Sequence, residues 1–210
     1  MLSKGSVVLL HGLGRGAGAS WPLARYLKRG DYYTFAPGYP SRTLPLPAIV
    51  DRLRAQIADL DGPVHFVTHS YGGIVAHRLI STAPPANLGR VVMLAPPHGG
   101  SEWADLLVRL KLDRLVMRAA TGELTTGRNA SPVADYPLGI IAGTRALDPI
   151  FPRLFVPRPN DGKVSLASTR LEGMTDHIEL PVSHTLMVWN PRVMAQVAAF
   201  LDTGTFTRAR

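Results

Sequence analysis

The sequence predicts an α/β fold, in which one mostly parallel sheet of about six strands is covered by helices on both faces. Short apolar runs such as Val7–Leu10 alternate along the chain with longer segments, such as 46–60, whose apolar residues recur at helical spacing. The apolar runs are continuous, which is typical of strands buried on both faces. A chain of 210 residues without repeats or linkers has room for one well-packed core, so we expect a single domain over residues 1–210.

The expected strands are bounded by turn-forming or polar residues. They cover residues 7–10, 32–36, 64–68, 91–95, 138–142 and 178–181. Strands that alternate with helices pair in parallel through right-handed crossovers. The carboxyl ends of such strands meet at one edge of the sheet, where ligands bind. Residues that follow the strands are therefore the first candidates for a functional site.

The expected helices lie between these strands and begin at residues that favour helix starts. They cover residues 21–29, 46–60, 72–82, a segment after 101, residues 164–172 and a last segment from 191. Ser20, Ser101 and Asn190 stand immediately before three of them, where a side-chain oxygen can accept a hydrogen bond from the first turn. Pro22 and Pro191 lie in first turns, where the missing N–H costs little.

Segment 98–137 interrupts the alternation of strands and helices. Its expected helix is apolar on one face and basic on the other, the basic residues being Arg109, Lys111, Arg114 and Arg118. We interpret the segment as a short helical insert in one of two ways. Either it is a small cap or lid that shields an acyl pocket and opens at a lipid surface, or it simply covers the sheet.

The composition restricts the class of protein and its partners. Apolar residues make up 46% and charged residues 18% of the chain, which is typical of a globular protein. The net charge is +8, but the longest basic run is Lys28-Arg29, so we favour a solvated surface over a nucleic-acid partner. No apolar run approaches the ~20 residues of a membrane span, although transient contact with a membrane surface suits the basic charge. The N-terminal sequence lacks the features of a signal peptide, so we expect a cytoplasmic location.

Several reactive groups are missing from the sequence. There are no cysteines, which excludes disulfides, thiolate metal sites and a cysteine nucleophile. We identify no pattern of histidines and carboxylates as a metal site. We therefore expect no metal ion and no cofactor.

A serine follows the third expected strand in the stretch FVTHSYGG, residues 66–73. An apolar strand, a serine and small residues are typical of a sharp strand-to-helix turn that exposes a nucleophile, for which the common pattern is G-x-S-x-G. Thr68 replaces the first glycine of this pattern, while Gly72 and Gly73 leave room for the turn and for the next helix. We interpret Ser70 as the nucleophile, the alternative being a polar residue in a turn.

A base and an acid for Ser70 follow later strands. A serine hydroxyl reacts at neutral pH only when a base removes its proton and a carboxylate orients that base. His184 follows the sixth strand, and Asp161 follows the fifth at some distance, in the turn sequence N-D-G. We interpret His184 as the base and Asp161 as the acid. Asp148, which also follows the fifth strand, is the alternative acid.

Acyl transfer also requires hydrogen-bond donors for the negative charge that develops on the substrate oxygen. We expect the backbone N–H groups of Tyr71, at the start of a helix, and of Leu13, after the first strand, to supply them. His98 lies near the same edge of the sheet and is a candidate pocket residue. His11 and His69 flank the catalytic loops, and we expect them to hold loop backbone instead of moving protons.

The motifs together resemble a known family. VVLLHGLGR, VHFVTHSYGG, RVVMLAPP, NDGKVS and LPVSHT, in this order and spacing, look like a small bacterial α/β-hydrolase of the lipase or esterase type. The resemblance extends over about residues 6–201 and is weakest in 101–137. It implies a minimal, six-stranded α/β-hydrolase fold, because the chain begins near the third of the eight strands that the family usually has.

The resemblance also implies roles for individual residues. The order serine, aspartate, histidine is that of the α/β-hydrolases. By this resemblance Ser70, Asp161 and His184 form a catalytic triad, and Leu13 and Tyr71 form the oxyanion hole. The implied activity is hydrolysis of a small-molecule or lipid carboxylic ester through an acyl-enzyme.

Other functions remain open at this point. The same triad serves acyltransferases, thioesterases and amidases, and a non-catalytic binding protein can share the fold. Residues 12–17, GLGRGA, match the permissive dinucleotide fingerprint, which requires an acidic residue at the end of the next strand. That strand ends in Phe35-Ala36-Pro37, without an acid, which argues against a nucleotide-binding protein.

Overall fold

The computed structural model describes residues 3–127, 132–147 and 155–208. Within these ranges, six strands form one sheet in the order β2-β1-β3-β4-β5-β6, and every neighbouring pair is parallel. The strands are β1 (Ser6–Leu10), β2 (Tyr33–Phe35), β3 (Val64–His69), β4 (Leu88–Leu94), β5 (Leu138–Gly143) and β6 (Asp176–Leu180). The predicted sheet is confirmed.

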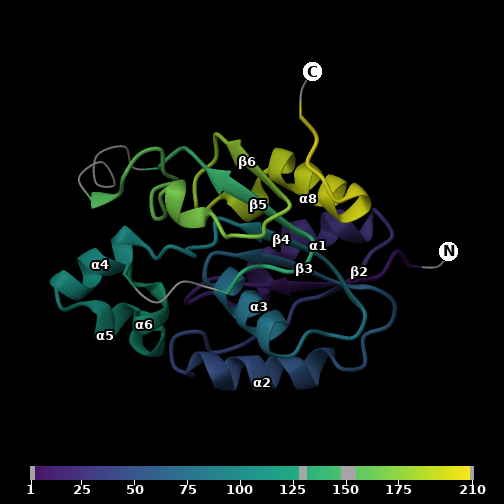
Figure 1. The fold of residues 1–210 in the computed structure, drawn as a ribbon, viewed down its shortest axis with the longest axis horizontal. Helices are drawn as coiled ribbons and strands as arrows, with labels where there is room; N and C mark the ends of the chain where they lie inside the picture. Colours follow the sequence, from purple (N-terminus) through teal and green to yellow (C-terminus); the bar gives the residue numbers. More distant parts are fainter. Residues whose placement is uncertain (1–2, 128–131, 148–154, 209–210) are drawn as a thin grey trace.

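Helices cover both faces of this sheet (Figure 1). On one face lie α1 (Trp21–Lys28) and α8 (Pro191–Thr203), and on the other lie α2 (Leu46–Ile57) and α3 (Tyr71–Thr82). Each of these helices turns its apolar residues towards the strands, so the core consists of two layers separated by the sheet.

The strands supply both core layers because successive side chains of a strand point to opposite faces. In β1, Val7 and Leu9 belong to the layer below α1 and α8, whereas Val8 and Leu10 belong to the layer below α2 and α3. All four side chains are at most 1% exposed. Burial on both faces is the reason for the continuous apolar runs in the sequence.

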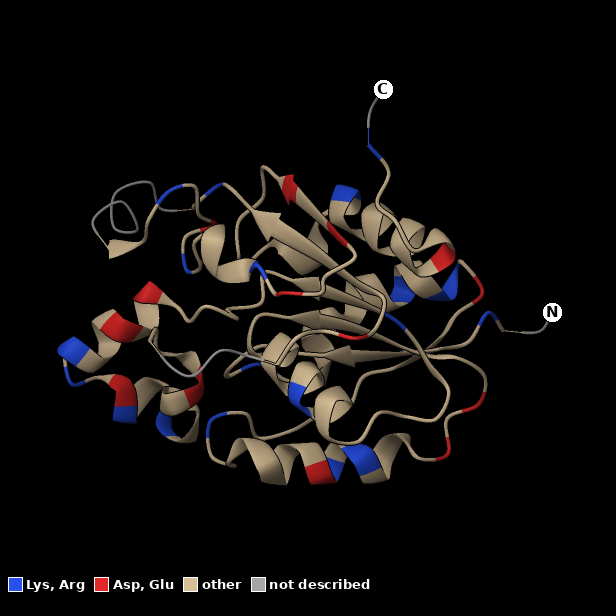
Figure 2. Cartoon of the chain, viewed as in Figure 1, with Lys and Arg blue, Asp and Glu red and all other residues tan. Residues whose placement is uncertain are grey.

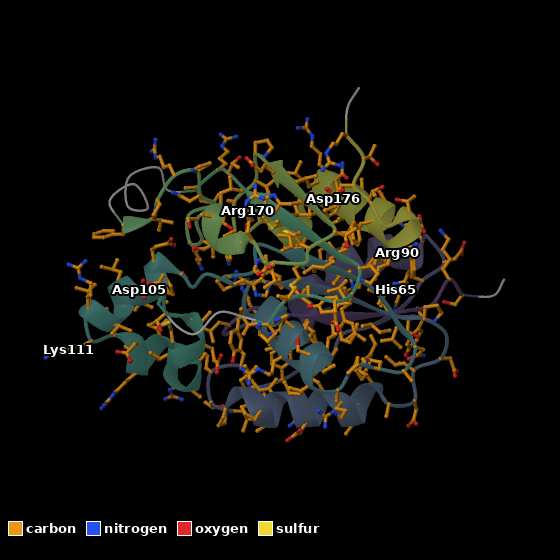
Figure 3. All side chains as sticks on the ribbon, in the orientation of Figure 1. His65, Arg90, Asp105, Lys111, Arg170 and Asp176 are labelled. Carbon is orange, nitrogen blue, oxygen red and sulfur yellow. The ribbon has the colours of Figure 1, made fainter. Side chains whose placement is uncertain are left out.

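The described part of segment 98–137 is a group of short helices before β5. They are α4 (Glu102–Arg109), α5 (Asp113–Val116), the 3-10 turn η2 (Arg118–Ala120) and α6 (Thr121–Leu124). The group lies at the end of the molecule opposite the N-terminus (Figure 1). Asp105 and Lys111 mark its place, far from His65 and Arg90 (Figure 3). Its inward side chains join the core layer below α2 and α3, namely Ala104, Leu107, Met117, Ala120 and Leu124.

The predicted helix over 164–172 is wrong. Only the short 3-10 turn η3 (Ala167–Thr169) forms there, held by the bond from the Thr169 N–H to the Leu166 carbonyl. Serine and threonine hydroxyls bind nearby backbone and side chains and so compete with helix formation. The hydroxyl of Ser165 donates to Glu102 Oε1 at 2.8 Å and that of Thr169 to the Leu166 carbonyl at 2.7 Å.

Of the three predicted helix caps, two are confirmed and one is wrong. The side chain of Ser101 accepts a hydrogen bond from Ala104 N, and that of Asn190 accepts bonds from the first turn of α8. Ser20 precedes α1 but its hydroxyl makes no capping bond. The chain enters α1 from a 3-10 turn, η1 (Ala17–Ser20), and Pro22 has no N–H to donate at the second helical position.

Lys and Arg residues are distributed over all parts of the chain, with acidic residues between them (Figure 2). This distribution agrees with the scattered charge of the sequence. In the ranges that the structure describes, no helix has the length and apolar character that crossing a membrane requires.

Candidate active site

Ser70 lies at the sharp turn between β3 and α3. Its φ of 55° and ψ of −125° lie outside the regions that non-glycine residues commonly adopt, so the backbone here is strained. Its N–H donates to the Leu94 carbonyl at 2.9 Å, and its own carbonyl accepts from the Gly73 N–H at 2.8 Å. Ser70 therefore sits at the carboxyl end of a central strand, in the strand-to-helix turn that the sequence predicts.

Glycines next to the turn allow the backbones to approach closely. A Cβ atom on Gly72 would lie 2.6 Å from the Leu10 carbonyl oxygen, and one on Gly12 would lie 3.1 Å from the Ser70 Cβ. Thr68 is accommodated in the core: its side chain is 1% exposed. Its hydroxyl has no hydrogen-bond partner among the described residues. The departure from G-x-S-x-G thus adds a buried hydroxyl without preventing the turn.

The side chains of Ser70, His184 and Asp161 form one hydrogen-bonded chain, although they come from three separate loops. His184 Nε2 lies 2.9 Å from Ser70 Oγ, and His184 Nδ1 lies 2.7 Å from Asp161 Oδ2. When Nδ1–H donates to the carboxylate, Nε2 is left to accept the serine proton. Asp148, the alternative acid, lies outside the described residues.

The N-D-G turn directs the carboxylate of Asp161. Its Oδ1 accepts the N–H groups of Lys163 and Val164 at 3.0 and 2.9 Å, which leaves Oδ2 for His184. Gly162 has a φ of +101°, a conformation that favours glycine. The His184 N–H also donates to the Asp161 carbonyl at 3.0 Å, so the two loops are tied together through their backbones.

Asp161 is ionised despite being only 2% exposed. Burial acts to raise the pKa of this carboxyl, but the adjacent His184 ring and the hydrogen bonds from His184, Val164 and Lys163 together hold the pKa below its usual value. The site therefore contains a fixed negative charge beside the ring nitrogen that faces away from Ser70.

The two predicted oxyanion donors border the serine. Tyr71 is the first residue of α3, and Leu13 lies in the loop after β1 and lines the same cavity as Ser70. The N-terminus of a helix carries partial positive charge, which suits a developing oxyanion. The side chain of Tyr71 is completely buried in the core layer below α2 and α3. Only its backbone is therefore available for the predicted role.

His69 holds loop backbone, as expected from the sequence. Burial, with the neighbouring His184 ring, lowers the pKa of His69 to about 3, so the ring is neutral. Its Nε2 lies 2.9 Å from the His184 carbonyl oxygen, to which the neutral ring donates. His11 acts similarly: its Nδ1 lies 2.9 Å from the Gly12 carbonyl oxygen, and its ring stacks on Tyr39.

A cavity of about 400 Å³ opens at Ser70 and His184. The helical insert supplies most of its apolar wall, through Trp103, Ala104, Leu115, Val116 and Leu124. The remaining lining residues are His69, at the end of β3, and residues of the loops that follow the strands. The arrangement can hold an acyl chain against the insert while the carbonyl carbon of a substrate faces Ser70.

His98 is not among the residues that line this cavity, which corrects the expectation for it. It is 6% exposed, and its Nε2 lies 3.2 Å from the Met93 sulfur. Its ring stands edge-on to that of His77, with 5.4 Å between the ring centroids. The side chain points back against β4 and α3 instead of towards the serine.

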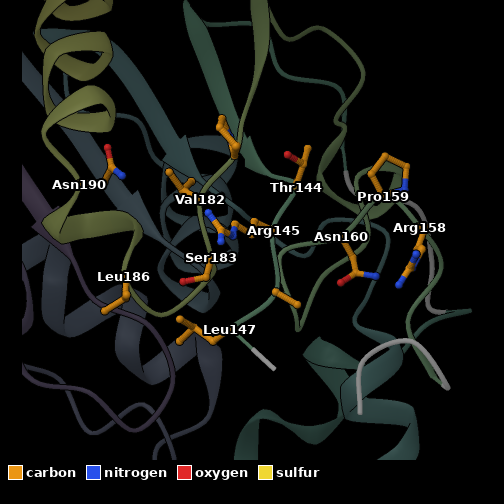
Figure 4. A pocket seen from close by; sticks show the side chains of 12 residues that line it. Thr144, Arg145, Leu147, Arg158, Pro159, Asn160, Val182, Ser183, Leu186 and Asn190 are labelled. Carbon is orange, nitrogen blue, oxygen red and sulfur yellow. The ribbon is translucent and has the colours of Figure 1, made fainter. Parts of the chain in front are cut away.

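A second cavity, of about 890 Å³, is lined by residues of the segments that follow β5 and β6 (Figure 4). Asn160 and Ser183, which precede Asp161 and His184, line it together with Arg145 and Arg158. We assign the chemistry to the smaller cavity, because Ser70 and His184 line that one. In the described ranges, no group of histidine and carboxylate side chains is arranged to hold a metal ion.

The fold and this arrangement define the class of protein. The chain belongs to the alpha/beta hydrolase family, whose model matches residues 7–204. The family that the sequence motifs indicate is therefore confirmed. No curated protein matches the chain in sequence.

Solved structures with the same fold include several hydrolases. The mature lipase BlEst2 of Bacillus licheniformis is 19% identical, with a TM-score of 0.75 over 97% of this chain and 93% of that chain. The phospholipase PlaB of Legionella pneumophila is 18% identical, with a TM-score of 0.60 over 78% and 45% of the two chains. A pyrethroid hydrolase of Sphingobium faniae JZ-2 is 15% identical, with a TM-score of 0.61 over 97% and 98%. At these identities the likeness shows the fold, and with the family it supports a hydrolase.

The charged residues of the cavity were not predicted from the sequence. Arg15, Arg42 and Lys163 all line it. Arg15 and Lys163 directly adjoin the motifs HGLG and NDG, which was the only signal available for them. Arg42 comes from a loop without a motif, and only the tertiary structure brings it to the site.

Proposed function

We propose that this chain is a serine hydrolase that cleaves carboxylic esters through an acyl-enzyme on Ser70. The proposal is carried by the hydrogen-bonded chain from Ser70 through His184 to Asp161, with its distances of 2.9 and 2.7 Å. A nucleophile, a base and an orienting acid at these distances are what acyl transfer requires. A binding protein of the same fold has no need of all three groups in this order.

In the first half of the reaction, Ser70 Oγ attacks the ester carbonyl carbon while its proton passes to His184 Nε2. Negative charge develops on the carbonyl oxygen, and the N–H groups of Leu13 and Tyr71 stabilise it. The bond from carbon to the alcohol oxygen then breaks, and His184 Nε2–H gives its proton to the leaving alkoxide. The products are a free alcohol and an acyl group bound to Ser70.

In the second half, water replaces the alcohol. His184 Nε2 accepts a proton from the water as its oxygen attacks the acyl carbon, and the bond to Ser70 Oγ breaks as the serine regains a proton. The carboxylic acid leaves and the enzyme is restored. Asp161 remains ionised throughout and stabilises the protonated ring of His184.

Hydrolysis of nitrophenyl esters from acetate to palmitate tests this function. We expect the wild-type chain to release nitrophenol with saturation kinetics, and Ser70→Ala to lose a factor of about 10⁴–10⁶ in kcat, as when other such triads are broken. Circular dichroism and thermal unfolding of Ser70→Ala provide the control for folding. A folded Ser70→Ala variant with near-normal esterase activity would contradict the proposal.

A further inference from the structure

The residues that line the cavity at Ser70 carry an excess of positive charge. Among the described residues that line it, three are cations, Arg15, Arg42 and Lys163, and none is a carboxylate. In the same described ranges, none of these three cations takes part in an ion pair. Asp161 is the acidic residue nearest to Lys163 in the sequence, but its carboxylate oxygens already bind His184 and the backbone of its own turn.

Lys163 is held at the edge of the cavity. It follows the N-D-G turn, its carbonyl accepts the Ser101 hydroxyl at 2.8 Å, and its ammonium nitrogen lies 5.4 Å from the centre of the Trp103 ring. The side chain is half-buried. A cation in partly desolvated surroundings exerts a stronger field than one in open water.

Arg15 approaches the same region from the opposite loop. It is exposed, and its loop is fixed by bonds from the Arg15 N–H to the Gly12 carbonyl and from the Gly14 N–H to Ser41 Oγ. The pKa of Lys163 is lowered first by burial and then by the charge of Arg15, and the charge of Asp161 opposes these effects without cancelling them. The two cations therefore repel each other across the cavity, and an anion between them would relieve the repulsion.

Arg42 has a different role. Its guanidinium donates to the Leu115 carbonyl, and its own carbonyl accepts the Ala119 N–H at 3.0 Å. These bonds join Arg42 to the insert, so its guanidinium is used to hold the wall of the cavity together. Arg15 and Lys163 are left with no bonded partner for their side-chain charges among the described residues.

We propose that the substrate is an ester that carries an anionic group a few bonds from its scissile carbonyl, and that Arg15 and Lys163 bind this group. The apolar wall from the insert takes the uncharged part of the molecule. The inference rests on the proposed function, because it names the substrate class of the same site. A carboxylate and a phosphate or sulfonate present the same chemistry to the two cations, on either the acyl or the alcohol side.

Two matched pairs of chromogenic esters test the inference and distinguish the sides. The first pair is nitrophenyl butyrate and the nitrophenyl half-ester of glutarate, which differ by a carboxylate on the acyl group. The second is ortho-nitrophenyl butyrate and its analogue with a carboxylate on the nitrophenol ring. In at least one pair, we expect kcat/KM of the anionic ester to exceed that of the neutral ester by about tenfold, equivalent to about 1.4 kcal/mol.

The variants Lys163→Gln and Arg15→Gln should each reduce this ratio, and the double variant should bring it close to one. Lys163→Gln should have the larger effect, because the charge of a half-buried group is screened less by water and salt. Because the ratio compares two esters on the same protein, any general loss of triad activity cancels from it. Lys28→Gln and Arg52→Gln remove exposed cations of α1 and α2 that do not line the cavity, and they should leave the ratio unchanged.

The outcomes separate the two proposals. If the two esters of each pair are hydrolysed with equal kcat/KM, the proposal of an anionic substrate is wrong. It is also wrong if the preference for the anionic ester survives in the double variant. In both cases the proposed esterase activity still stands. If no ester is hydrolysed, the esterase proposal fails, and the preference is measured by calorimetric binding to Ser70→Ala. Tighter binding of the methyl half-ester of glutarate than of methyl butyrate, lost in the double variant, would support the anion site, and equal binding would overturn it.

Discussion

Asp161 accepts hydrogen bonds with both of its carboxylate oxygens. Replacing it by asparagine keeps the shape of the side chain and removes its charge, so the two contributions can be measured separately. In Asp161→Asn, the amide oxygen can keep the bonds from the Lys163 and Val164 N–H groups, so folding should change little. The amide N–H₂ would face His184 Nδ1 and favour the tautomer with the proton on Nε2, which cannot accept from Ser70. We expect kcat to fall by about 10³–10⁴.

The comparison for this prediction is Asp148→Asn, which should cost less than about tenfold in kcat, because Asp161 already occupies the position beside Nδ1. Steady-state kinetics with one nitrophenyl ester measure both variants. A large loss in Asp148→Asn with a small loss in Asp161→Asn would reassign the acid.

His69 makes the stability of the protein depend on pH. The folded state keeps its ring neutral down to about pH 3, whereas the unfolded chain protonates it below about 6.5. The unfolded state then binds more protons, so the free energy of unfolding falls as the pH falls through this window. Between about pH 7.5 and about pH 5 the loss due to His69 amounts to at most about 2 kcal/mol.

His69→Gln keeps a side-chain N–H for the His184 carbonyl but removes the titration. Urea unfolding at the two pH values should therefore show a smaller loss of stability in His69→Gln than in the wild type. Burial also lowers the pKa of His177, to about 4. Its effect on stability is the same in both proteins and therefore cancels from the comparison. Equal losses in the two proteins would show that His69 is not kept neutral by the fold.

Single residues of the site differ in how far the sequence predicts them. Ser70, Asp161 and His184 are predictable because the chemistry restricts the residue types and the parallel sheet brings strand ends together. Arg15 and Lys163 are not, since a basic residue in a loop is most often a solvated one and nothing in the sequence marks which loops meet. His98 also lies in a loop that follows a strand, yet its side chain turns inward to Met93.

The element that most directly positions Ser70 is α3, which packs closely on β1 at Gly72. An added Cβ would lie 2.6 Å from the Leu10 carbonyl oxygen and 2.9 Å from that of His11, and neither backbone group can move freely. We expect Gly72→Ala to lower the free energy of unfolding by about 1–3 kcal/mol, as overpacking does. Displacement of the turn by about 1 Å should also reduce kcat by about a hundredfold.

Gly18→Ala is the matched control, because a Cβ at Gly18 meets no atom within 4 Å. Chemical unfolding and ester hydrolysis of both variants make the comparison. A Gly72→Ala variant as stable and active as Gly18→Ala would mean that the turn tolerates a shift of the helix.

At the level of elements, buried segments are predictable and polar ones are not. The strands and long helices follow from continuous apolar runs and from helical spacing of apolar residues, both of which reflect burial. The helix predicted over residues 164–172 does not form because hydroxyl groups there bind Glu102 and a local carbonyl. Such bonds compete with helix formation, and the spacing of apolar residues does not reveal them.

For the whole molecule, the open question from the sequence is whether the insert is a lid or a fixed cover. Met117 and Ala120 are completely buried in the core, and Arg42 bonds to the backbone of Leu115 and Ala119. We propose a fixed cover that belongs to the single domain. The rate should then saturate smoothly as a poorly soluble ester passes from dissolved molecules to an emulsion, and a sharp rise at the solubility limit would favour a mobile lid.

Our proposed function requires Ser70 to be a nucleophile that His184 activates. Intact-mass measurement after treatment with a fluorophosphonate, followed by peptide mapping, tests this activation, because the probe bonds covalently to activated serines. We predict one adduct, located on Ser70, with labelling greatly slowed in His184→Ala and absent in Ser70→Ala. An adduct on a different serine, or ester hydrolysis that continues without any adduct on Ser70, would show that Ser70 is not the nucleophile.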